Sequence, residues 1–352
     1  MVSKSINGGS IKGDSATKKA PKSAGKKASK LAAFEIDGLT VEPGTRGESE
    51  LAVSKLVTGA RVSMPLIVLH GAKPGPTIWL SAAVHGDEIN GVEIVRRVLE
   101  AVNPLELGGT ILAVPVVNVT GFVTGDRYLP DRRDLNRCFP GSPRGPLGSR
   151  TAHIFMREIV NRCSVGIDFH SGSDHRTNLA QIRADLNDDL TRQLANAFAA
   201  PVMLHASTRD GSLRRSATKT GAAVLLFEGG EAWRFDASII RSAVTGTLNV
   251  LASLDMIEQD DSTEQAGQPS IEARKSRWVR ARASGITQLW VGCADLVTKG
   301  QTIGRLHDSF GHRIAEIKSN IDGIVIGLNL DPTVNQGDAI VHIADITPEE
   351  IA

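Results

Sequence analysis

Short apolar runs alternate with longer amphipathic stretches from about Ala33 to Leu254, and no other feature of this 352-residue chain constrains its fold as strongly. The runs are nearly free of polar residues, and the stretches between them repeat apolar residues at helical spacing. Strands that are apolar on both sides and are followed by helices are typical of an α/β sheet buried on both faces. We therefore predict an α/β fold with strands at Pro65–Leu69, Thr77–Val84, Thr110–Val117, Val165–Phe169, Pro201–His205 and Ala223–Glu228, and helices at Glu88–Val102, Arg150–Arg162, Leu186–Ala199, Ser212–Thr220 and Asp236–Leu254.

The C-terminal quarter has a different pattern. Residues Glu258–Ser270 are polar and contain a proline, which is typical of a linker. Beyond them the chain repeats itself: Gly285-Ile286, Val297, Gly300, Ile303, Leu306 and Asp308 recur as Gly323-Ile324, Val334, Gly337, Ile340, Ile343 and Asp345. Two interlocking β units of this size resemble the barrel-sandwich fold of biotinyl and lipoyl carrier domains. The hairpin between them, Asp308–Arg313, has no lysine to modify, so we expect a structural or gating module.

The N-terminal residues 1–32 carry eight lysines against a single acid, Asp14, and lack the apolar segment of a secretory signal. Such a segment buries too little apolar surface to fold, so we expect a disordered, solvated tail in preference to a nucleic-acid-binding or targeting segment. The predicted organisation is this tail, a main α/β domain at 33–257, a linker at 258–270 and a β domain at 271–352.

Bulk composition narrows the class of partner. The formal net charge is +1 and aromatic residues make up 4%, whereas nucleic-acid binding favours a basic surface and stacking rings. No apolar run approaches the roughly 20 residues that span a bilayer. Cys138, Cys163 and Cys293 are odd in number and form no CxxC pair, which fits a reducing cytoplasm. We expect a cytoplasmic protein with a small-molecule partner, no specific nucleic acid and no membrane, and we leave a homo-oligomer open.

Two histidines and a glutamate stand at the ends of predicted strands. His85 ends one strand and Glu88 opens the next helix, while His170 ends a later strand. Two imidazoles and a carboxylate are good zinc ligands and leave a fourth position open, as in catalytic zinc sites. The structural alternatives are a helix-capping glutamate and buried core histidines. Asp168 could orient an imidazole, but its place in the same strand predicts that it points to the opposite face.

Several arginines and a further glutamate also lie at or after the ends of predicted strands, where ligands bind in such sheets. An arginine-rich loop, 127–141, follows the Thr110–Val117 strand, and guanidinium groups suit a carboxylate or a polarised carbonyl. A solvated surface loop is the alternative. Glu228 ends an apolar strand, where desolvation raises a carboxyl pKa into the range of a general base. Glu231 competes for that role but lies beyond the predicted strand.

Taken in order, the HxxE motif, the Arg-Tyr and Asp-Leu-Asn-Arg segments, the strand-end histidine and Glu-Gly resemble the succinylglutamate desuccinylase/aspartoacylase family over about residues 48–255. This family is a branch of the zinc carboxypeptidase clan. The resemblance implies a zinc-carboxypeptidase-like mixed sheet flanked by helices, with a small C-terminal β barrel-sandwich-like domain.

The same resemblance implies a role for each matching residue. It implies Zn²⁺ bound by His85, Glu88 and His170. It also implies a catalytic Glu228, an Arg127 that polarises the scissile carbonyl, and a substrate carboxylate held by Asn136 and Arg137. Relative to aspartoacylase, two extra residues separate Arg127 from Asp134, which leaves Arg133 as a competitor for the carbonyl role.

The expected activity is therefore zinc-dependent hydrolysis of the amide bond of a small N-acyl amino acid, a carbon–nitrogen bond other than a peptide bond. Glu228 would take a proton from water and deliver it to the leaving nitrogen. Three alternatives remain open: a metallocarboxypeptidase acting on peptides, an N-acetyl-diaminobutanoate deacetylase, and a non-catalytic binding protein with the same fold. The C-terminal module has two possible roles: it could cover the cleft and exclude large substrates, or it could be purely structural.

Overall fold

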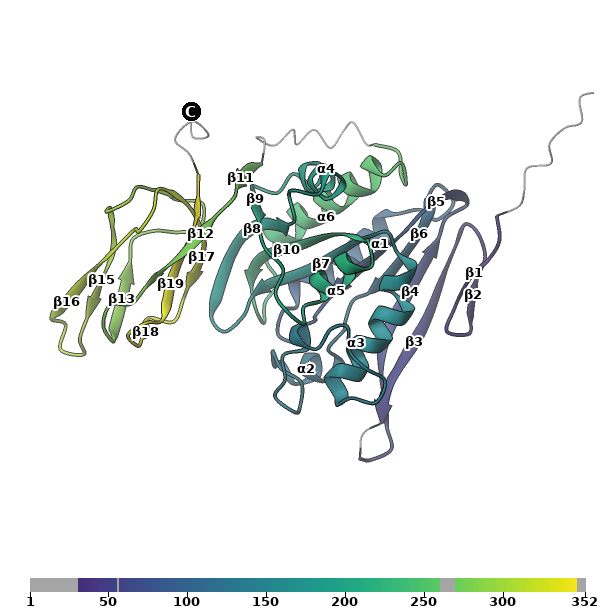
Figure 1. Ribbon diagram of the computed structural model, residues 1–352, viewed down its shortest axis with the longest axis horizontal. Helices are drawn as coiled ribbons and strands as arrows, with labels where there is room; N and C mark the ends of the chain where they lie inside the picture. Colours follow the sequence, from purple (N-terminus) through teal and green to yellow (C-terminus); the bar gives the residue numbers. More distant parts are fainter. Residues whose placement is uncertain (1–30, 56, 260–269, 347–352) are drawn as a thin grey trace, which may run out of the picture. The chain divides into compact units, whose positions relative to one another are not determined.

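A mixed sheet of 13 strands forms the framework of the protein (Figure 1). The computed structural model describes residues 31–55, 57–259 and 270–346. Most of the predicted lysine-rich tail and of the predicted linker therefore lies outside the described residues. Over the ranges just given, no helix combines the length and the apolar character that crossing a membrane requires.

The main α/β region has the mixed, helix-flanked sheet that was predicted. Its strands are β1 (Phe34–Ile36), β2 (Leu39–Val41), β3 (Thr45–Lys55), β4 (Arg61–His70), β5 (Lys73–Ala82), β6 (Gly108–Val114), β7 (Val165–Gly172), β8 (Arg176–Ala184), β9 (Val202–His205) and β10 (Ala223–Glu231). Strands β6, β5, β7 and β10 are parallel neighbours, and antiparallel β4 and β8 flank them. The helices are α1 (Asn90–Ala101), α2 (Val119–Thr124), α3 (Leu147–Glu158), α4 (Asp189–Phe198), α5 (Leu213–Lys219) and α6 (Ala237–Ser253), with single turns η1 (Leu135–Arg137) and η2 (Val160–Arg162).

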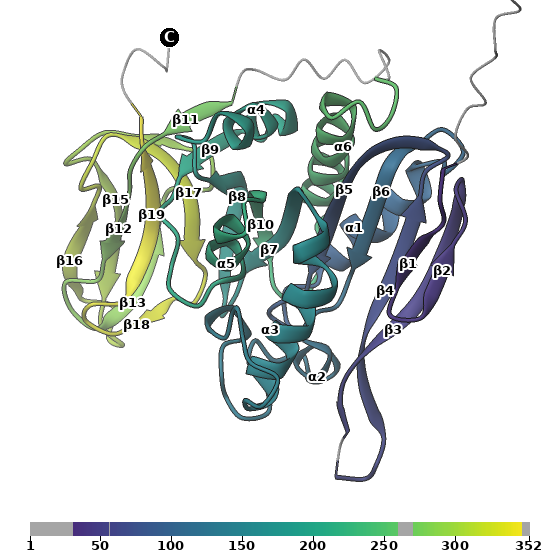
Figure 2. The ribbon, with the colours of Figure 1, turned by 45° about the vertical axis from the view of Figure 1, so that its right-hand side comes forward.

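Alternate residues of the central strands feed two separate apolar cores. Phe169 of β7 and Phe227 of β10 pack with α1, α4 and α6 on one face of the sheet. Trp79 of β5 packs with α3 and α5 on the other face (Figure 2). Gly166 makes room for the Trp79 ring, since a Cβ there would lie 2.0 Å from it. Burial on both faces explains the continuous apolar runs that identified these strands.

Four strands, one short helix and one helix start differ from the prediction. The sequence analysis missed β1, β2, β3, β8 and α2: β1 and β2 are only three residues long, α2 is one of six residues, and β3 and β8 carry polar residues at many positions. The helix expected from Glu88 begins at Asn90 instead, because Glu88 lies in the preceding turn, where its amide donates to the His85 carbonyl. The side chain of Glu88 therefore caps no helix.

The C-terminal repeat forms two interlocked β units, as predicted. Its strands are β11 (Ile271–Ala273), β12 (Ser276–Arg280), β13 (Gly285–Leu289), β14 (Leu296–Val297), β15 (Thr302–His307), β16 (Arg313–Lys318), β17 (Gly323–Asn329), β18 (Thr333–Val334) and β19 (Ala339–Asp345). Strand β14 of the first copy pairs with β17 of the second, and β18 of the second copy pairs with β13 of the first. The repeated positions Val297 and Val334, and Ile303 and Ile340, are buried in one common core.

Strand pairing continues from the main region into the C-terminal strands. Strand β8 pairs with β10 on one side and with β17 on the other, and β9 pairs with β11 (Figure 1). An apolar cluster also spans this connection: Val202 and Leu204 of β9 pack with Ile324 and Ile326 of β17. Part of the C-terminal region thus shares a sheet and an apolar cluster with the α/β region, through β11, β12, β14, β17 and β19. The remaining strands, β13, β15, β16 and β18, form a separate four-stranded sheet.

Candidate metal centre and active site

Strand register brings the predicted site residues to one face of the sheet. His170 of β7 lies beside Glu228 of β10. Because Phe169 and Phe227 point into the core formed with α1, α4 and α6, their neighbours His170 and Glu228 point to the opposite face, on the side of α3 and α5.

A sharp turn after β5 brings His85 and Glu88 to the same place. Ala83 has φ of 47°, and Gly86 lies so close to the backbone of Gly121 that a Cβ would come within 2.0 Å of it. Only glycine fits at that position. The turn thereby directs His85 and Glu88 back toward His170.

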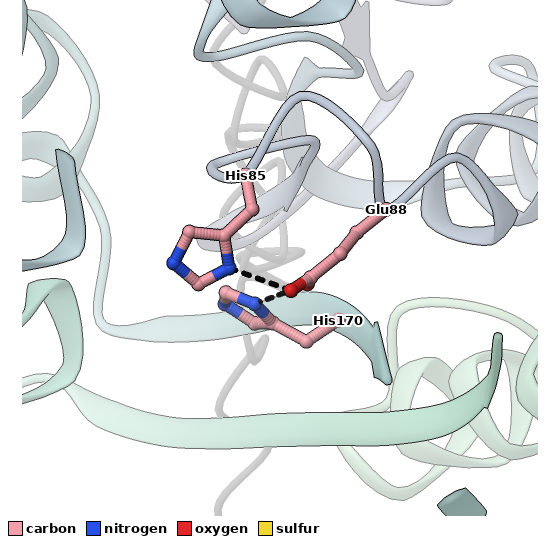
Figure 3. A group of neighbouring side chains, drawn as sticks. All are labelled: His85, Glu88 and His170. Atoms are coloured by element: carbon pink, nitrogen blue, oxygen red, sulfur yellow. Dashed lines mark hydrogen bonds and ion pairs between the residues drawn. The ribbon is translucent and has the colours of Figure 1, made fainter. Parts of the chain in front are cut away.

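His85, Glu88 and His170 converge on one point (Figure 3). Nδ1 of each histidine lies 2.7 Å from a Glu88 carboxylate oxygen, and one ligand atom from each residue lies within 4.8 Å of the others. All three side chains are buried. Of the described residues, these three form the group of histidines, cysteines and carboxylates that could hold a metal ion.

The far nitrogen of each imidazole is held by a second carboxylate. His85 Nε2 lies 3.1 Å from Asp134 Oδ1, and His170 Nε2 lies 2.9 Å from Asp168 Oδ2. Metal-binding histidines are typically fixed in this way, which leaves the other nitrogen free for the ion. The donor set and its supporting carboxylates therefore fit zinc, which prefers imidazole and carboxylate ligands.

The expectation that Asp168 points away from His170 was wrong. Residues two apart in a strand lie on the same face, so Asp168 reaches the ring of His170 and also accepts a 2.7 Å hydrogen bond from the Ser81 hydroxyl. Burial alone would lower the pKa of His170, but the carboxylates of Asp168 and Glu88 raise it well above its ordinary value. This negative field favours any cation at the site, a proton or a metal ion.

Asp134 is a site residue to which the sequence analysis gave no role. Besides His85, it contacts Arg127, whose Nη2 lies 3.4 Å from Asp134 Oδ2. Burial would raise the pKa of Asp134, but His85 and Arg127 hold it well below its ordinary value. Its position in the Asp-Leu-Asn-Arg segment could have identified Asp134 as a site residue.

Arg127 reaches the group formed by His85, Glu88 and His170, whereas its competitor Arg133 does not. Its Nη1 lies 2.6 Å from the Ser173 hydroxyl and 3.2 Å from Glu88 Oε1. Arg133 is exposed and pairs with Asp131 at 3.6 Å.

A cavity opens beside His85, Glu88 and His170. Asn136 and Arg137, which belong to the turn η1, line this cavity. The side-chain oxygen of Asn136 accepts a 2.9 Å hydrogen bond from the Leu213 amide at the start of α5. This bond fixes the amide group, whose NH2 has no hydrogen-bond partner among the described residues. The Arg137 side chain is exposed at the cavity.

Glu228 faces the cavity from the end of an apolar stretch of β10, as expected. Asn178 of β8 donates a 2.8 Å hydrogen bond to its Oε2. Desolvation raises the pKa of the Glu228 carboxyl above its ordinary value. Glu231 instead pairs with Arg234 at 3.3 Å and lines a different cavity, beside Trp233. Geometry thus separates the two candidate glutamates.

Residues 74–254 match the succinylglutamate desuccinylase/aspartoacylase catalytic domain, which is just over half of the chain. The chain belongs to this family. It is therefore a hydrolase that cleaves carbon–nitrogen bonds of amides other than peptide bonds.

Individual relatives agree with this assignment along most of the chain. The N-alpha-acetyl-L-2,4-diaminobutyric acid deacetylase of Halomonas elongata is 27% identical over 326 residues, covering 89% of this chain and 93% of the relative. A succinylglutamate desuccinylase/aspartoacylase structure from Rhodobacter sphaeroides is 26% identical with a TM-score of 0.77, covering 86% of this chain and 96% of that one. The product-bound ectoine utilization protein EutE (DoeB) of Ruegeria pomeroyi shares the fold, with 22% identity, a TM-score of 0.77 and coverage of 86% and 95%.

In this member of the family, the cavity at the His85–Glu88–His170 group has a volume of about 650 Å³, and residues that the sequence analysis missed line it. Four are arginines: Arg176 and Arg183 of β8, Arg209 of the loop after β9, and Arg214 of α5. Three others come from the C-terminal strands: Ser276 and Trp278 of β12 and His342 of β19. None of these residues lies at the end of an apolar strand, which was the criterion that identified the other site residues in the sequence.

Proposed function

We propose that the protein is a zinc-dependent deacylase that hydrolyses the amide bond of a small N-acyl amino acid. The observation that carries the proposal is the His85–Glu88–His170 cluster, with a carboxylate on the far nitrogen of each histidine and Glu228 beside it in the sheet. Hydrolytic zinc sites with two histidines and a glutamate keep a position open for water.

The metal would be held by His85, Glu88 and His170, and when bound it would supply Lewis acidity and a water of lowered pKa. Glu228 is placed to take a proton from the attacking water and to return it to the leaving nitrogen. Its raised pKa suits both steps, because a carboxyl group with a pKa nearer the working pH is a stronger base when ionised and is still acidic enough when protonated to donate to the leaving amine.

Arginine and amide groups would position the substrate. Arg127, held by Ser173 and Asp134, directs a guanidinium toward the metal-binding cluster and would donate to the oxygen of the scissile carbonyl as negative charge develops there. Asn136 and Arg137 would hold the α-carboxylate, which converts binding energy into orientation of the amide bond.

A second candidate is deacetylation of N-acetyl-diaminobutanoate, which the name of the Halomonas elongata relative favours. A peptidase is less well supported, because Trp278 and His342 wall the cavity on the side of the C-terminal strands and limit it to about 650 Å³. Cys138, Cys163 and Cys293 are unpaired, which is in keeping with a cytoplasmic enzyme.

The direct test is to measure bound metal in the purified full-length protein and to assay amine release from a panel of N-acetyl and N-succinyl amino acids and dipeptides. We expect one zinc per chain, loss of activity with a chelator, and recovery with Zn²⁺. Stoichiometric zinc without hydrolysis of any panel member would support a non-catalytic binding protein instead. Preferential hydrolysis of dipeptides would support a carboxypeptidase.

A further inference from the structure

Trp233 has an unusual backbone conformation for a large aromatic residue. Its φ is 59°, in the left-handed region that bulky residues rarely adopt. It lies in the loop between β10 and α6, and Asn90 fixes both ends of that loop. The Asn90 side chain donates a 3.2 Å hydrogen bond to the Glu231 carbonyl and accepts a 2.9 Å bond from the Asp236 amide. A conformation of this kind is unfavourable and persists only where the surrounding structure holds it, most often at functional sites.

Two hydrogen bonds join Trp233 to separate parts of the proposed active site. Its backbone amide donates a 3.0 Å bond to the carbonyl of Asp87, the residue before the proposed metal ligand Glu88. Its indole Nε1 donates a 2.7 Å bond to the carbonyl of Gly125, two residues before Arg127. Because the loop that carries Trp233 begins at the end of β10, these bonds connect the strand of the proposed general base to the other two segments.

The indole is an outside support for the segment that carries Arg127. Among the described residues, the other hydrogen bonds to the backbone of residues 125–127 come from within residues 118–127. The Asp126 amide donates a 2.8 Å bond to the Gly121 carbonyl, and the Asn118 side chain donates a 3.3 Å bond to the Arg127 carbonyl. The indole bond therefore ties this segment to a distant part of the chain.

The indole ring also lies beside the turn that holds the other end of Arg127. The rings of Trp233 and His175 have centroids 5.6 Å apart. His175 belongs to the turn between β7 and β8, two residues after Ser173, and the Ser173 hydroxyl lies 2.6 Å from Arg127 Nη1. Trp233 thus contacts both the segment that carries the Arg127 backbone and the turn that fixes its guanidinium group.

We propose that Trp233 is a positioning residue that holds Arg127 within reach of the scissile carbonyl. This inference rests on the proposed deacylase function, in which Arg127 donates to the carbonyl oxygen as negative charge develops there. Such a donor acts only at hydrogen-bond distance, and a misplacement of about 1 Å can lower the rate about 10²-fold. Trp233 is half-exposed and lines a different cavity from Arg127, so it acts through Arg127 and does not touch the substrate.

Variants of Trp233 should separate kcat from KM. Trp233→Phe keeps a ring beside His175 but removes the N–H donor. We expect kcat for the best acyl amino acid to fall about 10-fold, because the affected interaction strengthens only in the transition state. KM, zinc content and melting temperature should change little. Trp233→Gly should lower kcat further, because it also removes the ring, and glycine adopts a positive φ without strain.

Phe235→Leu is the matched control. Phe235 lies in the same loop, is also exposed, and its side chain has no hydrogen-bonding group. This variant should keep the wild-type kcat. An unchanged kcat in both Trp233 variants, or an equal fall in Phe235→Leu, would overturn the proposal.

A double-mutant cycle tests whether Trp233 acts through Arg127. In an Arg127→Ala background the guanidinium group is already gone, so adding Trp233→Phe should lower kcat no further. An equal fold-change in the wild-type and Arg127→Ala backgrounds would show that Trp233 acts by another route, and would contradict the proposal.

A binding measurement distinguishes failure of this inference from failure of the proposed function. Calorimetry of the full-length, zinc-loaded proteins uses methylphosphonate, a tetrahedral anion that resembles the intermediate formed from an acetyl group. Its affinity should fall in Trp233→Phe but not fall further when Trp233→Phe is added to Arg127→Ala. This pattern without hydrolysis of any acyl amino acid would retain the role of Trp233 and reject the deacylase. Hydrolysis with equal losses of methylphosphonate affinity in both backgrounds would do the reverse.

Discussion

Asn178 on β8 donates a 2.8 Å hydrogen bond to the carboxylate of Glu228 on β10. Gly327 of the C-terminal repeat lies opposite Asn178 in the sheet, and a Cβ at Gly327 would come within 2.8 Å of the Asn178 side-chain oxygen. The C-terminal strands therefore help to set the position of the proposed general base, in addition to walling the cavity.

Replacing Asn178 should shift the pH dependence of catalysis. A hydrogen bond donated to a carboxylate favours its ionised form, so its loss in Asn178→Ala raises the pKa of Glu228 further. Because the base must be ionised to act, the acidic limb of the kcat/KM profile should move to higher pH, with zinc content unchanged. Gly327→Ala should shift the profile in the same direction by displacing Asn178. A profile that keeps its acidic limb in both variants would show that Asn178 does not act on Glu228.

Metal content should follow the His85–Glu88–His170 cluster and not Glu228. His85→Ala or His170→Ala removes one of three protein ligands and should lose most of the bound zinc. Glu228→Gln should retain zinc and substrate binding while kcat falls roughly 10²- to 10⁴-fold, as is usual for loss of a general base. Metal analysis and steady-state kinetics on the same preparations provide the test. Equal zinc in all three variants would refute the ligand assignment, and an inactive Glu231→Gln with an active Glu228→Gln would reverse the choice of base.

Asp168 should tune metal affinity through His170. Asp168→Asn keeps the volume of this buried side chain but removes the charge that orients the imidazole, so zinc affinity should fall about 10- to 100-fold. Competition with a chelator measures this change. Asp131→Asn is the control, because Asp131 is an exposed loop carboxylate paired with Arg133 and away from the cluster. Similar zinc affinity in Asp168→Asn and Asp131→Asn would argue against an orienting role.

Trp278 should limit substrate size. Trp278→Ala opens the cavity wall beside His342, so kcat/KM for a small acyl amino acid should fall relative to that for a dipeptide or a long-chain acyl amino acid. Trp290, which is half-exposed on the C-terminal strands and does not line the cavity, provides the control variant Trp290→Ala. An unchanged ratio between the two substrates in Trp278→Ala would leave a purely structural role for this wall.

Removing the C-terminal strands altogether should destabilise the protein. A chain ending after Ile257 would expose the edges of β8 and β9 and the buried side chains of Val202 and Leu204. Each such side chain contributes about 1.5–3 kcal/mol when fully buried. We expect aggregation or a marked fall in melting temperature. A soluble, zinc-binding fragment with the original melting temperature would show that the α/β region folds independently.

Much of the site was predictable because its residues follow a local rule. His85, His170 and Glu228 each end an apolar strand, and such positions in parallel sheets gather at one edge. Asn178 and Arg183 do not follow this rule. They lie on β8, which contains too many polar residues to be recognised as an apolar run. They come near Glu228 only because β8 pairs antiparallel with β10. Asp168 was misjudged because strand alternation was applied to residues two apart as if they were adjacent.

The exchange of β14 and β18 between the two repeats bears on the origin of the C-terminal module. Each copy lacks a strand partner that only the other copy supplies, through Leu296 against Ile324 and through Ile286 against Thr333. A single copy would leave the edges of its strands unpaired and the shared core half built. An ancestral chain with one copy would therefore have been stable only as a dimer, and gene duplication would have made that dimer permanent within one polypeptide.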